Sequence, residues 1–218
     1  SPNMGTMLAY IFIDTHVPKN LLKKIMKGNL DYTFNSISVD SDTSTSDTLV
    51  LFSINKNKIN FNLRKNFKIL NLKVFEIMKN LSQQVVRDGE GLSKLIEVTI
   101  NNSKTENKAK KIAFSIIDSP LVKTAIAGED PNWGRVIMAI GKAEIKINLK
   151  KLAIKFGENK IVEKGSLIKD YEEEKVAEYM KSKNIEIIVE IGTGKESFTA
   201  YTMDLTKKYV EINSDYRS

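Results

Sequence analysis

The chain has 218 residues, a formal net charge of +7 and no cysteine, and 41% of its residues are hydrophobic. This length suits one large domain or a domain with an appendage. The lack of cysteine excludes disulfide scaffolds and thiolate zinc sites, and the single histidine, His16, leaves only one candidate for imidazole-based catalysis.

Features of membrane, secreted and nucleic-acid-binding proteins are missing from the sequence. No segment approaches the roughly 18 consecutive apolar residues of a membrane helix, and the first residues do not form a charged and then apolar signal peptide. The lysines are scattered through runs such as KNK and NLKK instead of forming one block with aromatic residues between them. We expect a soluble, cytoplasmic protein that binds neither membranes nor nucleic acid, and a basic binding module stays open as an alternative.

The first part of the chain alternates between predicted strands and helices. Residues 8–13 are a short apolar run, which predicts a buried strand. Residues 18–28 carry apolar side chains on one helical face and end at Gly28, so they predict a helix. Side chains of different polarity alternate along residues 32–40, which predicts a strand. The polar loop at residues 41–47 has two interpretations: it binds a polar ligand, or its hydroxyl groups form hydrogen bonds within the loop.

A long helix and a second strand–helix pair follow. Residues 68–87 have apolar positions at helical spacing, and residues 94–100 predict a strand. Ser103 and Glu106 have the spacing of a capping box, ahead of a helix that must end before Pro120.

The last part of the chain predicts a small antiparallel meander, a helix and two strands. The meander is expected at residues 144–149, 152–156 and 160–165, the helix at 171–183, and a strand at 185–192 that leads through a GTGK turn into another strand. Mixed strands and long helices in this order predict an α+β fold, with sheets covered by helices.

Glu90 is a candidate ligand-binding carboxylate because of the residues on either side of it. It lies in the run DGEG, on a glycine-flanked turn between a helix and a strand, where backbone can approach a ligand closely. The other interpretation is a helix end with a solvated glutamate. His16, just before a helix start, is interpreted as a structural hydrogen-bonding residue in preference to a catalyst.

Five stretches together carry a family resemblance. SPNMGTML, ISVDSDTSTSDT, VRDGEGLSK, GEDPNWGR and DLTKKYVEINSDYRS, in this order and over the whole chain, resemble the ornithine acetyltransferase (glutamate N-acetyltransferase) family of arginine biosynthesis. The resemblance implies the family's α/β sandwich, with a main portion at residues 6–140 and a smaller C-terminal portion at residues 141–218.

The resemblance also implies self-cleavage. Family members are made as one precursor that cuts itself before a threonine, which becomes the nucleophile of the new β chain. The matching residue is Thr6, so residues 1–5 correspond to the end of the α chain. The residue before the cut is Gly5 where the family usually has alanine, a change that removes one methyl group and loosens the local backbone.

An N-terminal threonine carries both a hydroxyl and an α-amine that can act as its base, with a pKa of about 8. By the resemblance, Thr6 takes the acetyl group from N-acetylornithine and passes it to glutamate by ping-pong kinetics. Acetyl-CoA is left open as a further donor, and no cofactor or metal is implied.

Substrate-binding positions of the family fall on Thr6, Glu90, Asn213 and Ser218. The family's oxyanion-hole pair and a substrate-binding lysine belong to the α chain, so we expect this chain to require that partner in an α2β2 heterotetramer. The alternative is an amidohydrolase or aminopeptidase of related N-terminal-nucleophile type, which would release the acyl group to water.

Overall fold

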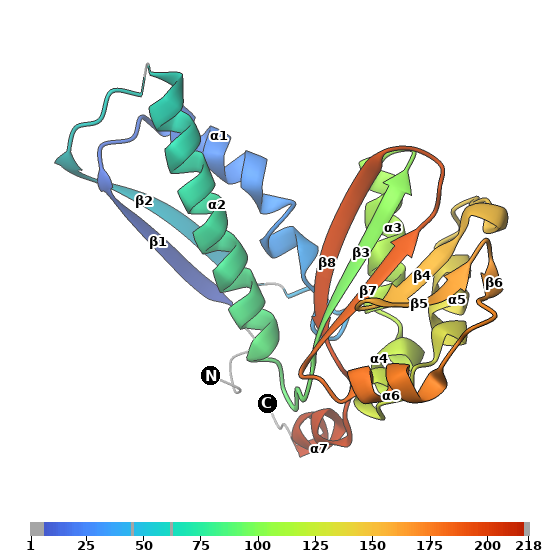
Figure 1. Cartoon of the computed structure of the whole chain (residues 1–218). Coiled ribbons are helices and arrows are strands. Elements are labelled where there is room, and N and C mark those ends of the chain that lie inside the picture. Colours follow the sequence, from blue (N-terminus) through green and yellow to red (C-terminus); the bar gives the residue numbers. More distant parts are fainter. Residues whose placement is uncertain (1–6, 45, 62, 216–218) are drawn as a thin grey trace. The chain divides into compact units, whose positions relative to one another are not determined.

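A computed structural model of the chain describes residues 7–44, 46–61 and 63–215 (Figure 1). Gly5, Thr6 and Ser218, which the sequence singles out, lie outside these described residues. The chain forms two compact units. Unit 1 takes the described residues of Ser1–Ile37 and Asp42–Val85, and unit 2 takes those of Ser38–Ser41 and Val86–Ser218.

Unit 1 is a two-stranded parallel sheet with two helices. Its elements are β1 (Leu8–Thr15), α1 (Lys19–Leu30), the 3-10 helix η1 (Phe34–Ser36), β2 (Thr48–Asn57) and α2 (Arg64–Arg87), whose last two residues are counted with unit 2. A small core joins one face of the sheet to the helices, and its buried members are Ile11 of β1, Ile25 of α1, and Val74 and Met78 of α2. Successive strand residues point to opposite faces, so only one face of the sheet meets this core.

Most of the elements predicted for unit 1 are confirmed. β1 covers the apolar run at residues 8–13, but alternate residues of this strand are exposed, so the expectation of a fully buried strand is wrong. α2 covers residues 68–87 and begins one turn earlier. α1 continues two residues beyond Gly28, the predicted stop. A glycine in a helix interior costs only about 1 kcal/mol, which flanking apolar contacts outweigh.

The strand predicted at residues 32–40 is wrong. The chain makes a turn and η1 there, because hydroxyl groups bond to the local backbone instead of allowing strand pairing. Thr33 Oγ1 donates to Asn29 O at 2.8 Å, and Ser36 Oγ donates to Thr33 O at 2.7 Å. The second strand of the unit is β2, which the sequence pattern did not reveal.

Unit 2 is a six-stranded mixed sheet with helices. Its elements are β3 (Leu95–Ser103), α3 (Glu106–Ile117), α4 (Pro120–Ala127), α5 (Trp133–Lys142), the 3-10 helix η2 (Leu149–Lys151), β4 (Ala153–Phe156), β5 (Asn159–Glu163), β6 (Ser166–Leu167), α6 (Glu173–Met180), β7 (Asn184–Glu190), β8 (Glu196–Met203) and α7 (Lys207–Asp215). The strand order is β6-β5-β4-β7-β3-β8. Only β3 and β7 pair in parallel.

The core of unit 2 lies between the sheet and its helices. Val98 and Ile100 of β3, Ile112 and Ile116 of α3, and Ile187 of β7 are all fully buried in one cluster. Buried and half-buried positions alternate along β3 and β7, which is the pattern of strands that turn one face to a helical layer. α3 packs against β3 and β8, and α5 packs against α3 and α4.

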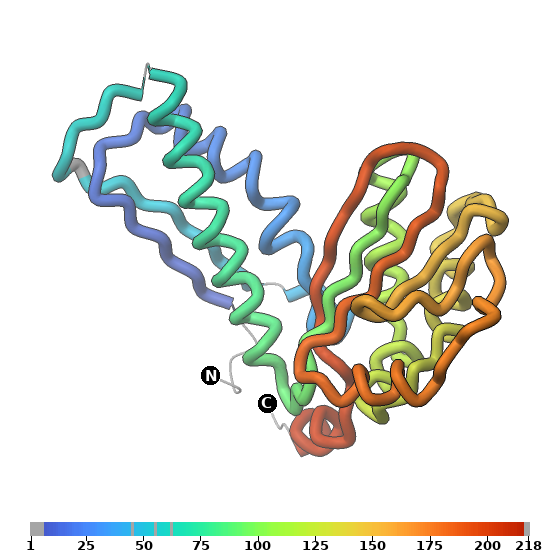
Figure 2. Tube along the Cα trace, in the orientation of Figure 1, coloured from blue at the N-terminus to red at the C-terminus, as the bar shows by residue number. Residues whose placement is uncertain are grey.

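The chain leaves β7 through residues 192–195 and enters β8 on the far side of β3 (Figure 2). The GTGK turn is therefore a connection over the end of β3 and not a hairpin between paired neighbours. The predicted strands at residues 152–156, 160–165 and 185–192 are confirmed, and so is the helix at 171–183, which is shorter in the structure.

Several local expectations for unit 2 are wrong. Thr105, not Ser103, caps α3, and its Oγ1 accepts from Lys108 N at 3.3 Å. Residues 144–149 form no strand. Pro120 stops α3 as expected but also begins α4, where a proline without an N–H is well tolerated.

The α+β class is confirmed by this architecture. The division expected at residues 140 and 141 stays a prediction. In the structure, strands from both sides of this position belong to the same six-stranded sheet.

Candidate functional site

The turn that carries Glu90 is held by its backbone. α2 ends at Arg87, and the turn has Gly91 at φ +71°, in the region that favours glycine. A Cβ atom on Gly91 would lie 2.5 Å from Tyr209 N, so the turn packs directly against the start of α7. Glu90 lies on a turn between a helix and a strand, as the sequence predicts, and its side chain is half-buried.

α7 brings Asn213 into the same part of unit 2. Thr206 Oγ1 donates to Gly91 O at 2.6 Å and accepts from Tyr209 N at 3.3 Å, so one hydroxyl both caps α7 and binds the glycine turn. Asn213 is exposed one turn further along, where its Nδ2 donates to Tyr209 O at 3.0 Å. The structure thus joins the turn of Glu90 to the helix of Asn213.

A third motif meets α7 at the Tyr209 side chain. Tyr209 Oη donates to Asp40 Oδ2 at 3.1 Å, and Asp40 belongs to the stretch ISVDSDTSTSDT. The neighbouring residues are tied to unit 2 as well, since Ser38 Oγ donates to Asp118 Oδ1 and Lys123 Nζ donates to Val39 O. Three stretches far apart in the sequence therefore converge around α7.

Asp118 and Lys123 are oppositely charged residues that influence each other beside this segment, and Asp118 is half-buried. Lys123 is only 2% exposed. Burial raises the pKa of the Asp118 carboxyl, which the hydrogen bond from Ser38 and the charge of Lys123 oppose. Burial lowers the pKa of the Lys123 ammonium, against the attraction of Asp118 and Asp40. Sequence patterns did not single out either residue, and a lysine on the apolar face of a short helix is the signal that could have done so.

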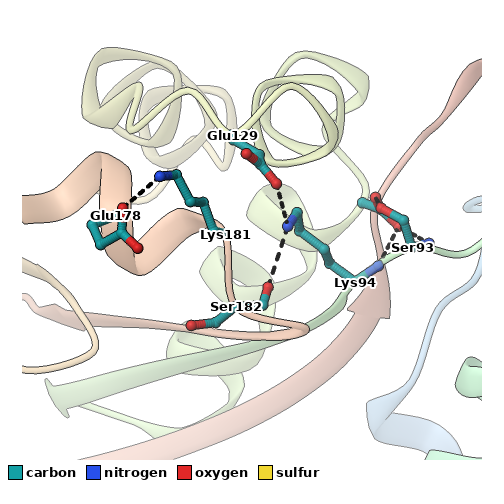
Figure 3. Close-up of polar contacts among 7 residues, drawn as sticks. Ser93, Lys94, Glu129, Glu178, Lys181 and Ser182 are labelled. Atoms are coloured by element: carbon teal, nitrogen blue, oxygen red, sulfur yellow. Dashed lines mark hydrogen bonds and ion pairs between the residues drawn. The ribbon is translucent and has the colours of Figure 1, made fainter. Parts of the chain in front are cut away.

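Asp204 fixes the chain just before β3. This fully buried carboxylate accepts from Ser93 N at 2.9 Å and Lys94 N at 3.0 Å, and it also accepts from Ser93 Oγ. Lys94 Nζ in turn bonds to Glu129 Oε1 at 3.0 Å and to Ser182 O at 3.3 Å (Figure 3). These contacts link β8, β3 and the loop after α4.

The polar residues of the GEDPNWGR motif hold neighbouring helices and strands of unit 2 together. Glu129 bonds to Lys94, and Asn132 caps α5 by accepting from Arg135 N at 3.2 Å. Arg135 Nη1 donates to Leu121 O at 2.8 Å, which ties α5 to α4. These residues position helices and do not assemble with Glu90.

The hydroxyl-rich loop holds the backbone next to Thr6. Asp47 Oδ1 accepts from Met7 N at 3.0 Å, and Thr48 N donates to Met7 O at 2.8 Å. Ser44 Oγ accepts from Ser46 N at 3.3 Å, which supports the self-satisfying interpretation of the hydroxyl groups. Asp47 is a residue that sequence reasoning missed. His16 is exposed, and its backbone N–H donates to Asn57 O.

Two kinds of feature are missing from the part of the chain that the structure describes. No helix within these residues has the length and apolar content that a membrane crossing requires. No group of three or more His, Asp or Glu side chains within the same residues could hold a metal ion.

The comparisons with known proteins agree over the whole chain. A family model described as "ArgJ family" matches residues 1–218. The Arginine biosynthesis bifunctional protein ArgJ of Bartonella quintana is 46% identical over 223 residues, and that of Zymomonas mobilis is 46% identical over 221 residues. Both alignments cover 100% of this chain and 54% of the relative, so the chain spans about half the length of these curated relatives.

A solved structure has the same fold. The crystal structure of Arginine biosynthesis bifunctional protein argJ from Bacillus halodurans superposes with a TM-score of 0.86 at 33% identity, and the match covers 96% of this chain and 100% of that one. Fold and sequence thus place the chain among proteins with this mixed α+β architecture. The chain belongs to the ArgJ family.

Proposed function

We propose that this chain is the β chain of a glutamate N-acetyltransferase, which moves the acetyl group of N-acetylornithine to glutamate in arginine biosynthesis. The observation that carries the proposal is the family match, which runs over residues 1–218 and so includes Thr6. The relatives' description as bifunctional arginine biosynthesis proteins supports the same pathway. We include acetyl-CoA in the proposal as a further acetyl donor.

Self-cleavage at Gly5-Thr6 comes first in this proposal. Thr6 Oγ adds to the Gly5 carbonyl, and the peptide bond is replaced by an ester. The break of the C–N bond frees the α-amine of Thr6, and water then hydrolyses the ester to give the Gly5 carboxylate and the free Thr6 hydroxyl. The lengths of the relatives support a precursor that is cut into two chains. This chain covers 54% of a curated relative, but it covers 100% of the Bacillus halodurans chain in the crystal.

The transfer uses the same oxygen. The α-amine of Thr6 takes the hydroxyl proton while Oγ attacks the acetyl carbonyl of N-acetylornithine. Ornithine leaves with a proton, and the acetyl group stays on Thr6 as an ester. The amine of glutamate then attacks this ester and restores the free hydroxyl. This chemistry requires no metal or cofactor, in keeping with a chain that has no cysteine and one histidine.

Glu90, Asn213 and Ser218 bind the substrate in this proposal. The Glu90 carboxylate suits an ammonium group, and the Asn213 amide with the Ser218 hydroxyl suits the polar amino-acid end. The contacts of Gly91 with Tyr209 and Thr206 support a shared site, because they join the Glu90 turn to the helix of Asn213. Asp47 has a positioning role, since it holds the N–H of Met7, the residue after the nucleophile.

The partner in this proposal is the α chain of the same precursor, in a cytoplasmic α2β2 assembly. The α chain supplies the oxyanion-hole pair and a substrate-binding lysine, so the β chain alone is inactive.

Three substitutions in the full-length precursor test the proposal. Thr6→Ala and Thr6→Val lack the hydroxyl, so both precursors should remain single uncut chains without transferase activity. Thr6→Ser keeps the oxygen and should be cut, more slowly, with part of the activity. Intact mass and an acetyl-transfer assay measure both outcomes. Cleavage of the alanine precursor before residue 6, or full activity without cleavage, would refute the shared role of Thr6.

Incubation of the cut protein with N-acetylornithine alone separates the transferase from a hydrolase. A transferase stops after one acetyl group per Thr6, whereas a hydrolase of related N-terminal-nucleophile type continues to release acetate without glutamate.

A further inference from the structure

α7 carries Asn213, yet this helix buries very little of its surface. Among the described residues Lys207–Asp215 that form α7, none is buried, and only Tyr209 and Ile212 are half-buried. Apolar burial stabilises a contact by about 25 cal/mol per Å², so a helix that buries little apolar area is weakly fixed by packing. The polar contacts of its first turn therefore contribute much of what holds α7 in place on unit 2.

The start of α7 bonds to two other segments of unit 2. Thr206 Oγ1, just before the helix, donates to Gly91 O at 2.6 Å, and Tyr209 Oη donates to Asp40 Oδ2 at 3.1 Å. A single bond at the start of a helix leaves the helix able to turn about that point. The bond from the Tyr209 side chain supplies a second fixed point, which restricts the direction and the rotation of α7.

Asp40 is a firm partner for this bond, because the residues before it are fastened to the main sheet and helices of unit 2. Ser38 N donates to Tyr201 O of β8 at 3.0 Å. Ser38 Oγ donates to Asp118 Oδ1, and the buried Lys123 donates through Nζ to Val39 O. The Tyr209 hydroxyl therefore connects an exposed helix to a segment that is itself well anchored.

Asn213 lies on the same face of α7 as Tyr209. Residues four apart are neighbours on a helix surface, and here Asn213 Nδ2 donates to Tyr209 O at 3.0 Å. Any rotation of α7 that moves the Tyr209 ring thus moves the Asn213 amide with it.

We propose that Tyr209 and Asp40 are positioning residues, which hold α7 so that the Asn213 amide meets the amino-acid end of the substrate. The inference rests on the proposed function, in which Asn213 binds that end of the substrate. Tyr209 and Asp40 act through α7 and not on the reacting atoms. Without their bond, α7 occupies the binding orientation for a smaller fraction of the time, and the apparent affinity falls by that fraction.

Steady-state kinetics of the cut protein, with its two chains together, test this role. Tyr209→Phe removes the hydroxyl and keeps the ring. It should raise KM for N-acetylornithine about five- to tenfold and leave kcat within about twofold, because the lost binding is common to the ground state and the transition state. A merely structural role would instead reduce the folded fraction, which lowers the apparent kcat and leaves KM unchanged.

Tyr179→Phe is the matched control. It removes the same hydroxyl from α6, where Tyr179 Oη accepts from Glu186 N at 2.9 Å. This change should lower stability and leave KM at the wild-type value. An unchanged KM in Tyr209→Phe would overturn the inference, and so would an equal rise of KM in the two phenylalanine variants.

Two substitutions of Asp40 examine the other side of the bond. Asp40→Asn keeps an oxygen that accepts from Tyr209 and should keep KM near the wild-type value, whereas Asp40→Ala has no acceptor and should raise KM as Tyr209→Phe does. Combining Asp40→Ala with Tyr209→Phe should raise KM no further than either change alone, because both remove one interaction. Fully additive effects in the double variant would refute the shared role.

Hydrogen exchange separates this inference from the proposed function. In Tyr209→Phe, the amide protons of residues 211–215 should exchange at least about fivefold faster than in the wild type, with those of β3 unchanged. If the wild type transfers no acetyl group, the proposed function fails, while faster exchange in α7 would still support Tyr209 as the residue that fixes the helix of Asn213. Unchanged exchange in α7 would overturn the inference even in an active enzyme.

Discussion

Glu90 is a residue whose side chain contributes little to the fold. Its turn is fixed by Gly91 and Thr206 through backbone contacts, which leaves the carboxylate available for a ligand. Glu90→Gln should therefore lower kcat/KM about 10- to 100-fold, which corresponds to the loss of one charged hydrogen bond of about 1.5–3 kcal/mol. Thermal unfolding should be unchanged.

Glu211→Gln is the matched control for Glu90→Gln. Glu211 lies on α7 and pairs only across the surface with Lys208, at 3.3 Å, so its loss should leave kcat/KM unchanged. If kcat/KM is unaltered in Glu90→Gln, Glu90 does not bind the substrate and is a solvated residue at a helix end.

Asp118 should give the stability of the fold a measurable pH dependence. Burial raises its pKa in the folded state above the ordinary value of 3.8. The unfolded state thus loses its proton first as the pH rises, and the contribution of Asp118 to stability declines between about pH 4 and its folded pKa. Asp118→Asn keeps the acceptor for Ser38 without the titration. The unfolding free energy of the wild type minus that of the variant should fall as the pH rises from 4 to 7.

Urea unfolding at several pH values measures this difference. A difference that stays constant or increases over the range would show that Lys123 and the bond from Ser38 outweigh the effect of burial on Asp118.

At the scale of elements, the close contact between the glycine turn and α7 is possible only because Gly91 has no side chain. Gly91→Ala adds a Cβ that would lie 2.5 Å from Tyr209 N, at a φ of +71° that costs a residue with a side chain about 1–2 kcal/mol. We expect a loss of about 2 kcal/mol or more in unfolding free energy, together with a lower kcat/KM, because Glu90 and α7 must move apart.

Gly141→Ala is the control for this change. Gly141 lies within α5 and has no atom within 4 Å of the added Cβ, so alanine should stabilise the protein by up to about 1 kcal/mol. If both alanine variants unfold like the wild type in urea, the close packing of the turn on α7 is refuted.

At the scale of the whole molecule, the two units have unequal cores. The buried core of unit 1 consists of Ile11, Ile25, Val74 and Met78, whereas that of unit 2 joins most of its strands and helices. In the isolated chain, we expect amide protons of α2 around Val74 to exchange at least about tenfold faster than those of β3 around Val98, because unit 1 opens at a lower free energy. Native-state hydrogen exchange measures this. Equal protection in α2 and β3 would mean that the chain unfolds as one cooperative body.

Local patterns predicted the elements whose signals depend on a few neighbouring residues. The apolar spacing of residues 68–87 predicted α2, and the apolar run at residues 8–13 predicted β1. The DGEG turn was predicted for the same reason, since glycine conformations are set by the residue itself. The α+β class followed from the order of these elements. The family motifs also pointed to Glu90 and Asn213, and the fold joins the turn of Glu90 to the helix that carries Asn213 through Gly91 and Thr206.

The remaining features depend on contacts between residues far apart in sequence. The alternation at residues 32–40 resembled a strand, but Thr33 and Ser36 bonded to the adjacent backbone, and β1 found its partner in β2. The link from Tyr209 to Asp40 and the burial of Lys123 likewise have no local signature. Hydrophobic periodicity records which side of an element is buried but not what buries it, so strand partners and buried charges are decided only when the elements pack.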